Sequence, residues 1–339
     1  MINSLYLKNY KLFKELRIDS LTQVNLLIGK NNVGKTSVLE AIMLFSDDQN
    51  IVQNLFNILR LRKLFPNTKN TNLSSQQCLE ILRTFFHNQT HLFDETIFIG
   101  ANEQQGHSIS LSHNNAVPRQ PTLVIKPANN TVEEILLSGF QQMFNEITSH
   151  ETHQVFINTS HSQPDDFLAQ IWGKIALSDK EQYLIDALKI IDDNIERLAF
   201  IDDTTHTKKA IVKLRDTKQP ILLNTMGDGI NLMLRTLLAL VHCENGYLFI
   251  DEFATGLHWS VQAALWKMIF QLSLKLNIQI FATTHSLDTL YAFQEIAKQD
   301  ETNVAVIKLQ KFSKKNKIKA VHFKTEDIMI AVEQNIEVR

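Results

Sequence analysis

The sequence has little cysteine, glycine or proline, and its charges nearly balance. Cys78 and Cys243 are the only cysteines, and neither lies near a CxxC pair or a histidine-rich segment. This excludes a disulfide framework and a cysteine-based zinc site, and it favours a reducing, cytoplasmic location. The chain has 34 Lys and Arg against 36 Asp and Glu, a formal net charge of −2. A globally basic nucleic-acid coat protein is therefore excluded.

Long apolar runs are also missing. The longest runs are too short or too interrupted to cross a bilayer, and the N-terminus lacks the apolar core of a signal peptide. We therefore expect no insertion into a membrane. Hydrophobic residues still make up 44% of the 339 residues, which excludes a disordered chain and allows a sizeable core. The length fits two lobes or one large α/β unit.

The ten glycines are unevenly placed. Gly29 and Gly34 lie in one short loop, and a second group of four falls between residues 227 and 256. Glycine is favoured where the backbone adopts a positive φ or approaches another group closely. Both groups flank the motifs described next.

Hydrophobic periodicity predicts an α/β fold. Residues 24–28 (VNLLI) form an apolar run of the kind that is buried on both faces of a sheet, and a helix is expected over residues 36–45. Helical periodicity returns between residues 165 and 197, with Ile191 and Ile195 on the apolar face. Shorter runs predict strands at residues 2–8, 16–18, 97–99, 108–112, 122–126 and 155–157. From residue 221 onward strands and helices alternate, which favours a parallel sheet.

Near the C-terminus, residues 304–309 and 318–323 are expected to pair as a hairpin. The basic stretch at residues 311–319 (KFSKKNKIK) is then better explained as a solvated turn than as a nucleic-acid patch, because a short charge cluster is a weak signal.

Residues 29–36 read GKNNVGKT and match GxxxxGK[ST] at every fixed position. A predicted buried strand precedes this loop and a helix follows it, which is the context that the phosphate-binding motif requires. A chance Gly/Asn loop with a lysine would not explain that order. We expect backbone N–H groups to surround phosphate oxygens, Lys35 to reach the β- and γ-phosphates of ATP, and Thr36 to bind Mg²⁺. The residues assigned to nucleotide binding here are Gly29, Lys30, Asn31, Asn32, Val33, Gly34, Lys35, Thr36 and Ser37.

A second apolar strand, residues 247–250, ends in Asp251 and Glu252. We expect Asp251 to hold Mg²⁺ and Glu252 to orient a water molecule in line with the γ-phosphate. Two carboxylates at the end of a buried strand are costly unless an ion or partner compensates them. A strand that simply runs out into solvent would not explain why this pair accompanies a phosphate loop.

A third strand, residues 278–282, leads into His285. Taken alone, a histidine after a strand is more often structural than catalytic. Here it follows the Asp-Glu pair by one helix and one strand, so a neutral imidazole would be placed to contact the γ-phosphate and the attacking water.

At these residues the chain resembles the ABC-type ATPases of the SMC and RecF branch. It is most similar to their stand-alone bacterial relatives, the AAA-type ATP-binding proteins related to the ATPase half of OLD-family nucleases. The similarity is carried by residues 29–42, 226–240, 247–262, 280–288 and the ending 327–339. The motifs span roughly the first 45 and last 130 residues, and the middle is not matched by motif.

The resemblance implies a P-loop NTPase with an ABC-type head: a mainly parallel sheet core, an antiparallel β lobe and an inserted helical region. Residues 1–47 and 210–339 would be two halves of one ATPase core, and residues 48–209 would be the insertion with part of the β lobe and a helical arm. The chain would thus be a single interrupted ATPase head rather than two domains in tandem.

The resemblance also implies the roles of residues. Lys35 and Thr36 would be the Walker A pair, Asp251 and Glu252 the Walker B pair, and His285 the switch histidine. Residues 255–258 would be a D-loop. Gly227 and Gly229 would contact ATP held by a second subunit. This implies a head-to-head homodimer or higher homo-oligomer that ATP closes and hydrolysis loosens.

The sequence departs from the family pattern in its signature motif. LSGGQ is absent, and Asp228 stands between the two glycines. A carboxylate beside a phosphate is unfavourable, so Asp228 would point away or bind a cation or an arginine. The glutamine of a Q-loop stays open among Gln104, Gln105, Gln120 and Gln163. Tyr10 and Phe13 are candidates for adenine stacking.

Two functions remain open. The first is an ATP-hydrolysing dimer that controls a separate effector, such as a nuclease, or a DNA-processing partner, in anti-phage defence or DNA maintenance. DNA is a further candidate ligand, and a partner would dock on residues 48–220. The second is a nucleotide-gated binding scaffold with little turnover. The missing LSGGQ argues against a transporter subunit, and Glu252 argues against a small-molecule kinase because it positions water rather than an acceptor.

Overall fold

The computed structural model describes residues 1–65, 73–87, 92–114, 119–147, 153–158, 165–190, 192–202, 207–253, 257, 259–312 and 317–323. The chain divides into two compact units. Unit 1 takes residues 1–21, 30–152 and 308–321, and unit 2 takes residues 22–29, 153–307 and 322–339. Each unit is therefore assembled from segments that are distant in the sequence.

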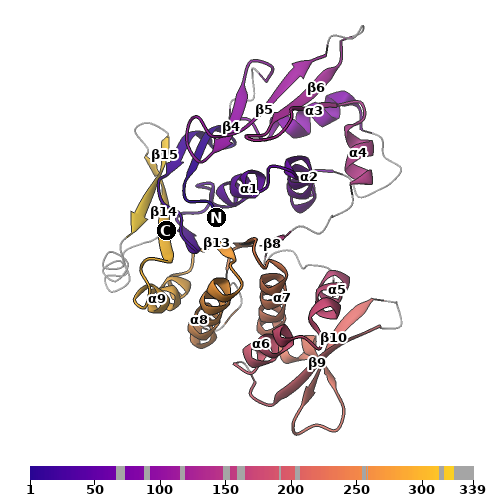
Figure 1. Cartoon of the computed structure of the whole chain (residues 1–339), viewed down its shortest axis with the longest axis vertical. Coiled ribbons are helices and arrows are strands. Elements are labelled where there is room, and N and C mark those ends of the chain that lie inside the picture. Colours follow the sequence, from indigo (N-terminus) through magenta and orange to yellow (C-terminus); the bar gives the residue numbers. More distant parts are fainter. Residues whose placement is uncertain are drawn as a thin grey trace. The chain divides into compact units, whose positions relative to one another are not determined.

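Unit 1 contains a six-stranded antiparallel sheet in the order β2-β1-β4-β5-β6-β7. Its strands are β1 (Leu5–Tyr10), β2 (Phe13–Ile18), β4 (Thr96–Gly100), β5 (Gly106–His113), β6 (Pro121–Lys126) and β7 (Glu133–Leu136). Its helices are α1 (Lys35–Phe45), α2 (Ile51–Leu61), α3 (Ser75–Arg83) and α4 (Phe140–Glu146) (Figure 1). The predicted antiparallel β lobe is confirmed.

Local sequence explains how unit 1 is built. In β5, residues 107, 109 and 111 are buried and their neighbours are less so, which is the period of a strand with one covered face. Helix α3 begins at a capping box in which Ser74 and Gln77 each bind the other's backbone N–H. Phe56 of α2 packs edge-on against Phe140 and Phe144 of α4, with ring centroids 5.0 and 5.4 Å apart. These contacts join helices that the sequence separates by about 80 residues.

His107 of β5 is buried at the end of α1. The backbone N–H of Ala128 donates to its Nδ1 at 2.9 Å, so the neutral ring carries its proton on Nε2. That nitrogen lies 3.4 Å from the Phe45 carbonyl oxygen and 3.3 Å from the Asp48 carboxylate. Burial lowers the pKa of His107, and Asp48 opposes the shift without reversing it.

The His107 site predicts a pH dependence of stability. Since the folded pKa lies below the unfolded value of about 6.5, the unfolded chain binds the proton first as pH falls. The free energy of unfolding should therefore be highest above pH 6.5 and fall below it, by at most about 1.4 kcal/mol per pH unit from this group. Urea unfolding at pH 7.5 and 5.5, compared between the parent and His107→Gln, measures the contribution. Equal pH slopes in the two proteins would contradict it.

Unit 2 is built on parallel strands. The sheet order is β15-β14-β3-β13-β12-β8, and β3 with β13, β13 with β12, and β12 with β8 all pair in parallel. These strands are β3 (Val24–Ile28), β8 (Gln154–Asn158), β12 (Tyr247–Asp251), β13 (Gln279–Thr283), β14 (Val304–Phe312) and β15 (Lys317–Phe323). Residues 308–321, which include parts of β14 and β15, are counted in unit 1. The helices of unit 2 are α5 (Asp165–Ile175), α6 (Asp179–Leu188), α7 (Asp228–His242), α8 (Trp259–Lys275) and α9 (Leu287–Ala297). The predicted mainly parallel core is confirmed.

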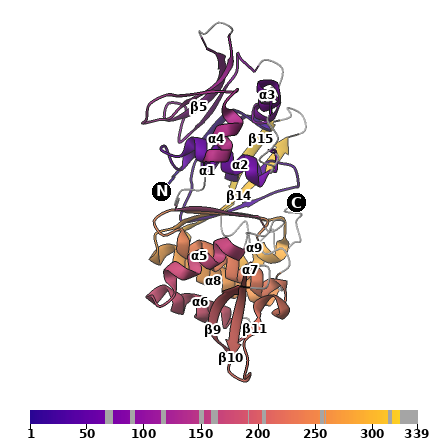
Figure 2. The same cartoon turned by 90° about the vertical axis from the view of Figure 1, so that its right-hand side faces the viewer.

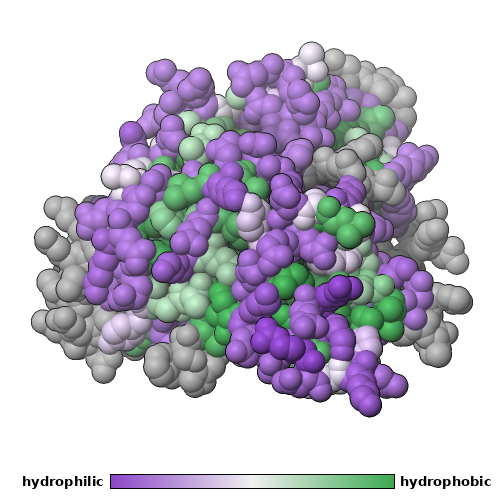
Figure 3. All heavy atoms as spheres, turned by 60° about the horizontal axis from the view of Figure 1, so that its bottom comes forward, coloured by the Kyte–Doolittle hydropathy of each residue, from purple (hydrophilic) through white to green (hydrophobic). Residues whose placement is uncertain are grey.

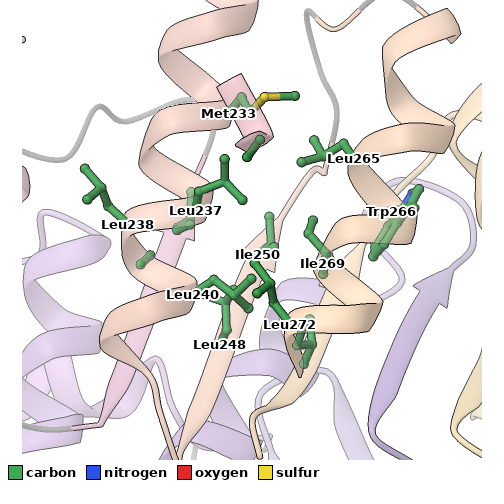
Figure 4. Close-up of a cluster of buried hydrophobic side chains, with 14 of the residues drawn as sticks. Met233, Leu237, Leu238, Leu240, Leu248, Ile250, Leu265, Trp266, Ile269 and Leu272 are labelled. Carbon is green, nitrogen blue, oxygen red and sulfur yellow. The ribbon is translucent and has the colours of Figure 1, made fainter. Parts of the chain in front are cut away.

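Helices α7 and α8 pack on β12 and supply much of the core of unit 2. Figure 4 shows Leu237 and Leu240 of α7, and Ile269 and Leu272 of α8, around Leu248 and Ile250 of the strand. Five of these six side chains are at most 1% exposed, and Leu272 is 6% exposed. Full burial of one such side chain is worth about 1.5–3 kcal/mol, so this cluster holds β12, and with it Asp251, firmly in place.

A second sheet of unit 2 corrects one expectation. The periodicity predicts a helix at Ile195, but this residue begins strand β9 (Ile195–Asp202). Strand β9 pairs antiparallel with β10 (Lys208–Leu214), which pairs with β11 (Ile221–Leu222) (Figure 2). The helical spacing ends because Asp192 starts a turn: its carbonyl accepts from the N–H of Ile195 and its carboxylate from that of Asn194. Ile195 is fully buried as part of a strand, and its spacing from the apolar residues of α6 fits a helix only by coincidence. Ile191 lies outside the described residues.

On the face shown in Figure 3, hydrophobic residues reach the surface in separate patches among hydrophilic ones. In the part of the chain that the structure describes, none of the helices combines the length and apolar character needed to cross a membrane.

Candidate functional site

The loop of residues 29–36 leaves β3 in unit 2 and enters α1 in unit 1. Three of its residues have positive φ: Gly29 at 142°, Asn32 at 62° and Gly34 at 95°. A Cβ on Gly34 would also lie 2.5 Å from Cζ of Phe13. Gly34 is thus required both by its backbone conformation and by the aromatic ring packed against it.

Helix α1 begins directly at this loop without a side-chain cap. Gly34 is its N-cap, no side chain bonds to the first turn there, and that turn contains no acidic residue. A helix start of this kind carries partial positive charge and directs backbone N–H groups outward, which suits a phosphate. Neither a capping side chain nor an acidic residue of the first turn occupies the place of an anion at the start of α1.

The side chains of the loop are graded in exposure. Lys30, Asn31 and Asn32 are exposed, Lys35 and Thr36 are half-buried, and Val33 and Ser37 are buried. The Nζ atom of Lys35 donates to the carbonyl oxygen of Lys30 at 3.0 Å, so this side chain folds back over its own loop. An ammonium in that place would meet a phosphate held by the loop.

A buried charge cluster that the sequence analysis missed anchors α1. Glu40 is 2% exposed and binds two cations, Lys11 and Arg62, with the Arg62 contacts at 2.5 and 3.0 Å. Burial, with a smaller effect of Arg62, lowers the pKa of Lys11 to about 8 although Glu40 opposes the shift. The three residues are far apart in the sequence, so no spacing pattern could have indicated them.

The carboxyl ends of β3, β13 and β12 lie at one edge of the parallel sheet. Leu27 pairs with Thr283, and Ala282 pairs with Ile250. Gly29 follows the first strand, Asp251 and Glu252 close the last, and His285 follows the middle one. The structure therefore brings the start of the loop, the Asp-Glu pair and the histidine segment to the edge where open α/β sheets bind ligands.

Asp251 and Glu252 differ in their surroundings. Asp251 is 6% exposed, and its Oδ1 accepts a hydrogen bond from the Thr283 hydroxyl at 2.7 Å. Glu252 is half-buried with a φ of 58°, and its backbone N–H donates to the same hydroxyl at 2.9 Å. His285 is exposed, one residue before Ser286, which caps α9. No motif in the sequence indicates a role for Thr283.

The residues present fit Mg²⁺ bound together with a nucleotide. The buried carboxylate of Asp251 is a hard oxygen ligand, which this ion prefers. Within the described ranges, no group of three or more His, Cys, Asp or Glu could hold a metal ion by itself. An ion here would thus take one or two protein oxygens, and phosphate oxygens would supply the rest.

Gly227 begins helix α7 and is open to its surroundings. Its φ is 108°, it is exposed, and a Cβ placed on it would meet nothing within 4 Å. No side chain caps the helix there. Gly229 is half-buried in the first turn. The expected orientation of the Asp228 side chain lies outside what the structure describes.

The candidates for adenine stacking, for the Q-loop and for the D-loop lie in different places. Tyr10 and Phe13 are 0% and 1% exposed, so neither ring presents a free face to adenine, contrary to expectation. Gln104 and Gln105 lie in the turn between β4 and β5, and Gln120 precedes β6. Gln163, residues 327–339 and all of the expected D-loop except Leu257 lie outside the described residues.

Comparison with known proteins gives a consistent result. The model of the AAA ATPase domain family matches residues 1–175 and 129–290. An ATP/GTP phosphatase of Helicobacter pylori is 25% identical over 336 residues, covering 89% of this chain and 90% of the relative. The DNA replication and repair protein RecF of Oenococcus oeni is 47% identical over 45 residues, 13% of this chain and 12% of that protein.

Among solved structures, an Smc head bound to the C-terminal winged-helix domain of ScpA superposes with a TM-score of 0.51. The match covers 96% of this chain and 98% of that one at 12% identity, so it shows a shared fold.

Proposed function

Because this chain belongs to the AAA ATPase domain family and is an ATPase, we propose that it works as an ATP-gated, head-to-head dimer that controls a separate effector protein. The observation that carries the proposal is the start of α7. Gly227 has positive φ, is exposed and has open space around it, at a helix start without a side-chain cap. Such a start suits a phosphate presented by a second copy of the chain.

The chemistry that we propose uses the residues at the ends of the strands. Lys35 and the N–H groups at the start of α1 hold the β- and γ-phosphates of ATP. Thr36 and Asp251 hold Mg²⁺, which when bound neutralises phosphate charge. Glu252 orients and deprotonates the attacking water, and His285 contacts the γ-phosphate. The loop that contains Lys35 starts at the end of β3, and one strand of the sheet separates β3 from β12.

The relatives support the partner and the reaction in different ways. The Helicobacter pylori relative is named for hydrolysis of both ATP and GTP, so we propose GTP as a second substrate. The Smc head was solved with the winged-helix domain of ScpA, which supports a protein partner for this fold. We propose a nuclease-like effector, docked on residues 48–220, in anti-phage defence or DNA maintenance, with DNA as a further ligand.

The two cysteines within the described residues are free and buried, and a cytoplasmic location stays a prediction.

The dimer proposal predicts the effect of one substitution. Gly227→Asp places a carboxylate and a strained L-residue at the exposed start of α7. We expect ATP to increase the mass of the parent protein to that of a dimer, measured by light scattering, and to leave the variant a monomer. ATP binding to the monomer should stay within about threefold, since Lys35 is unchanged.

Gly139→Asp is the matched control, because Gly139 is also a helix N-cap but lies in unit 1 on α4 with φ of −101°. Its dimerisation should equal that of the parent. If ATP leaves the parent a monomer, the dimer proposal is wrong.

The alternative is a nucleotide-gated scaffold with little turnover. It forms the same ATP-dependent dimer as the first proposal but hydrolyses ATP much more slowly. Steady release of many phosphates per protein chain under saturating ATP would exclude it. ATP that stays bound and intact through repeated dimer formation would favour it.

A further inference from the structure

One hydroxyl group connects the two acidic residues at the end of β12. Oγ1 of Thr283 donates its hydrogen to Oδ1 of Asp251 at 2.7 Å and accepts the backbone N–H of Glu252 at 2.9 Å. Thr283 is fully buried at the last position of β13, and Asp251 is 6% exposed. A hydroxyl is one of few groups that can donate and accept at once, so this position requires Thr or Ser.

The backbone explains why Glu252 needs this contact. Pairing between β12 and β13 ends at Ile250 and Ala282, and Glu252 then turns to a φ of 58°, which is uncommon for a residue with a side chain. Its N–H leaves the sheet ladder at that point and needs another acceptor. The Thr283 hydroxyl is that acceptor.

The next residue is held by Thr283 as well. The N–H of Phe253 donates to the Thr283 carbonyl oxygen at 2.8 Å. The ring of Phe253 packs on Trp266 of α8, with centroids 4.0 Å apart, and is 2% exposed. Glu252 is thus fixed on both sides: the Thr283 hydroxyl holds its own N–H, and the Thr283 carbonyl with Trp266 holds its neighbour.

We propose that Thr283 is a positioning residue for ATP hydrolysis. Through its hydroxyl it orients the Asp251 carboxylate toward Mg²⁺ and keeps Glu252 in the turn from which it acts on water, without touching the nucleotide itself. This inference rests on the proposed roles of Asp251 and Glu252. Loss of the hydroxyl should therefore affect turnover and Mg²⁺ dependence more than the affinity for nucleotide.

The test compares Thr283→Val, which removes the hydroxyl and keeps the shape, with Thr283→Ser, which keeps the hydroxyl. A small displacement of a catalytic group can lower a rate by up to about 100-fold. We expect kcat of Thr283→Val to fall about 10- to 100-fold and KM for ATP to change less than about threefold. Thr283→Ser should stay within about threefold of the parent.

A binding measurement gives a readout independent of turnover. The Mg²⁺ concentration that half-saturates binding of a fluorescent, non-hydrolysable ATP analogue should rise several-fold in Thr283→Val and not in Thr283→Ser. In a Glu252→Gln background, Thr283→Val should lower kcat less than it does in the parent, because part of its effect acts through Glu252.

The matched control is Thr236→Val in α7. Thr236 is 1% exposed and its hydroxyl bonds to the Leu232 carbonyl at 2.8 Å, so this variant also loses one buried hydrogen bond. Its kcat and Mg²⁺ dependence should match the parent even if its melting temperature falls. If Thr283→Val does not fold, Thr283→Ala and Thr283→Ser differ only by the hydroxyl and should show the same contrast.

Parent-like kcat and Mg²⁺ dependence in Thr283→Val, or an equal loss of kcat in Thr236→Val, would overturn the proposal. The proposed function fails in a different way. The dimer proposal fails if ATP leaves the parent a monomer, and the role of Glu252 fails if Glu252→Gln hydrolyses ATP like the parent, whatever the Thr283 variants do.

Discussion

Replacing Glu252 by Gln is expected to lower kcat for ATP hydrolysis about 100- to 10,000-fold while ATP affinity stays within about threefold. The change removes a carboxylate that accepts a proton and keeps the shape of the side chain. The backbone contact to Thr283 does not involve the carboxylate, so the turn should persist. Phosphate release under saturating ATP measures kcat, and equilibrium binding of ATP measures affinity.

Glu244→Gln is the matched control for that experiment. Glu244 is also in unit 2, but it is 41% exposed and paired with Lys180. Its kcat should equal that of the parent. Should Glu252→Gln retain the parent rate, Glu252 would not be the general base, and His285 would become the next residue to test. Retained ATP binding with no turnover would also trap the proposed dimer, which light scattering can detect.

Replacing Glu40 by Gln is expected to lower the free energy of unfolding by about 3–5 kcal/mol. Glu40 is buried between Lys11 and Arg62, and Lys11 is only 9% exposed. Removing one partner of a buried ion pair leaves an uncompensated charge in a medium that solvates it poorly. Urea unfolding followed by circular dichroism measures the loss.

The surface pair of Arg17 and Asp19 provides the control, since these side chains are 66% and 72% exposed. Asp19→Asn should change stability by no more than about 1 kcal/mol. Adding Lys11→Met to Glu40→Gln removes one unpaired cation and should recover part of the loss. Equal effects at Glu40 and Asp19 would show that the cluster does not stabilise unit 1.

The same cluster predicts how the Glu40→Gln effect varies with pH. The pKa of Lys11 in the parent is about 8, below its value of about 10.4 in an unfolded chain. Between these values the unfolded chain binds more protons, so stability rises with pH. Without Glu40, which raises this pKa, the rise begins at lower pH. The difference between parent and variant should therefore shrink as pH rises toward about 8 and stay constant above it, where both proteins gain stability equally.

The sequence alone was enough to predict those features that consecutive residues define. The loop of residues 29–36 is defined by consecutive residues, and the strands and helix that flank it were predicted because burial on both faces leaves a continuous apolar run. The mainly parallel sheet followed from alternating elements and the antiparallel lobe from the family resemblance, and the structure confirms both. The catalytic and metal-binding roles of Lys35, Thr36, Asp251, Glu252 and His285 stay predictions.

Hydrophobic periodicity predicted the wrong element where an apolar residue is buried by strand pairing instead of by a helix face. Ile195 fitted a helical spacing after α6, yet it is buried as the first residue of β9. Strand and helix patterns coincide over a few residues, and only pairing with β10 separates them. The hairpin of β9 and β10 was missed for the same reason.

The sequence by itself determined the phosphate loop with the strand and helix beside it, and the acidic pair that ends β12, because each is set by residues next to one another in the chain. Tertiary structure alone decided what supports them. Thr283 reaches Asp251 and Glu252 across 31–32 residues, and Glu40 meets Lys11 and Arg62 across 29 and 22. Such contacts have no local signature, because a hydrogen bond or an ion pair depends on distance in space, which only the packed sheet and helices fix.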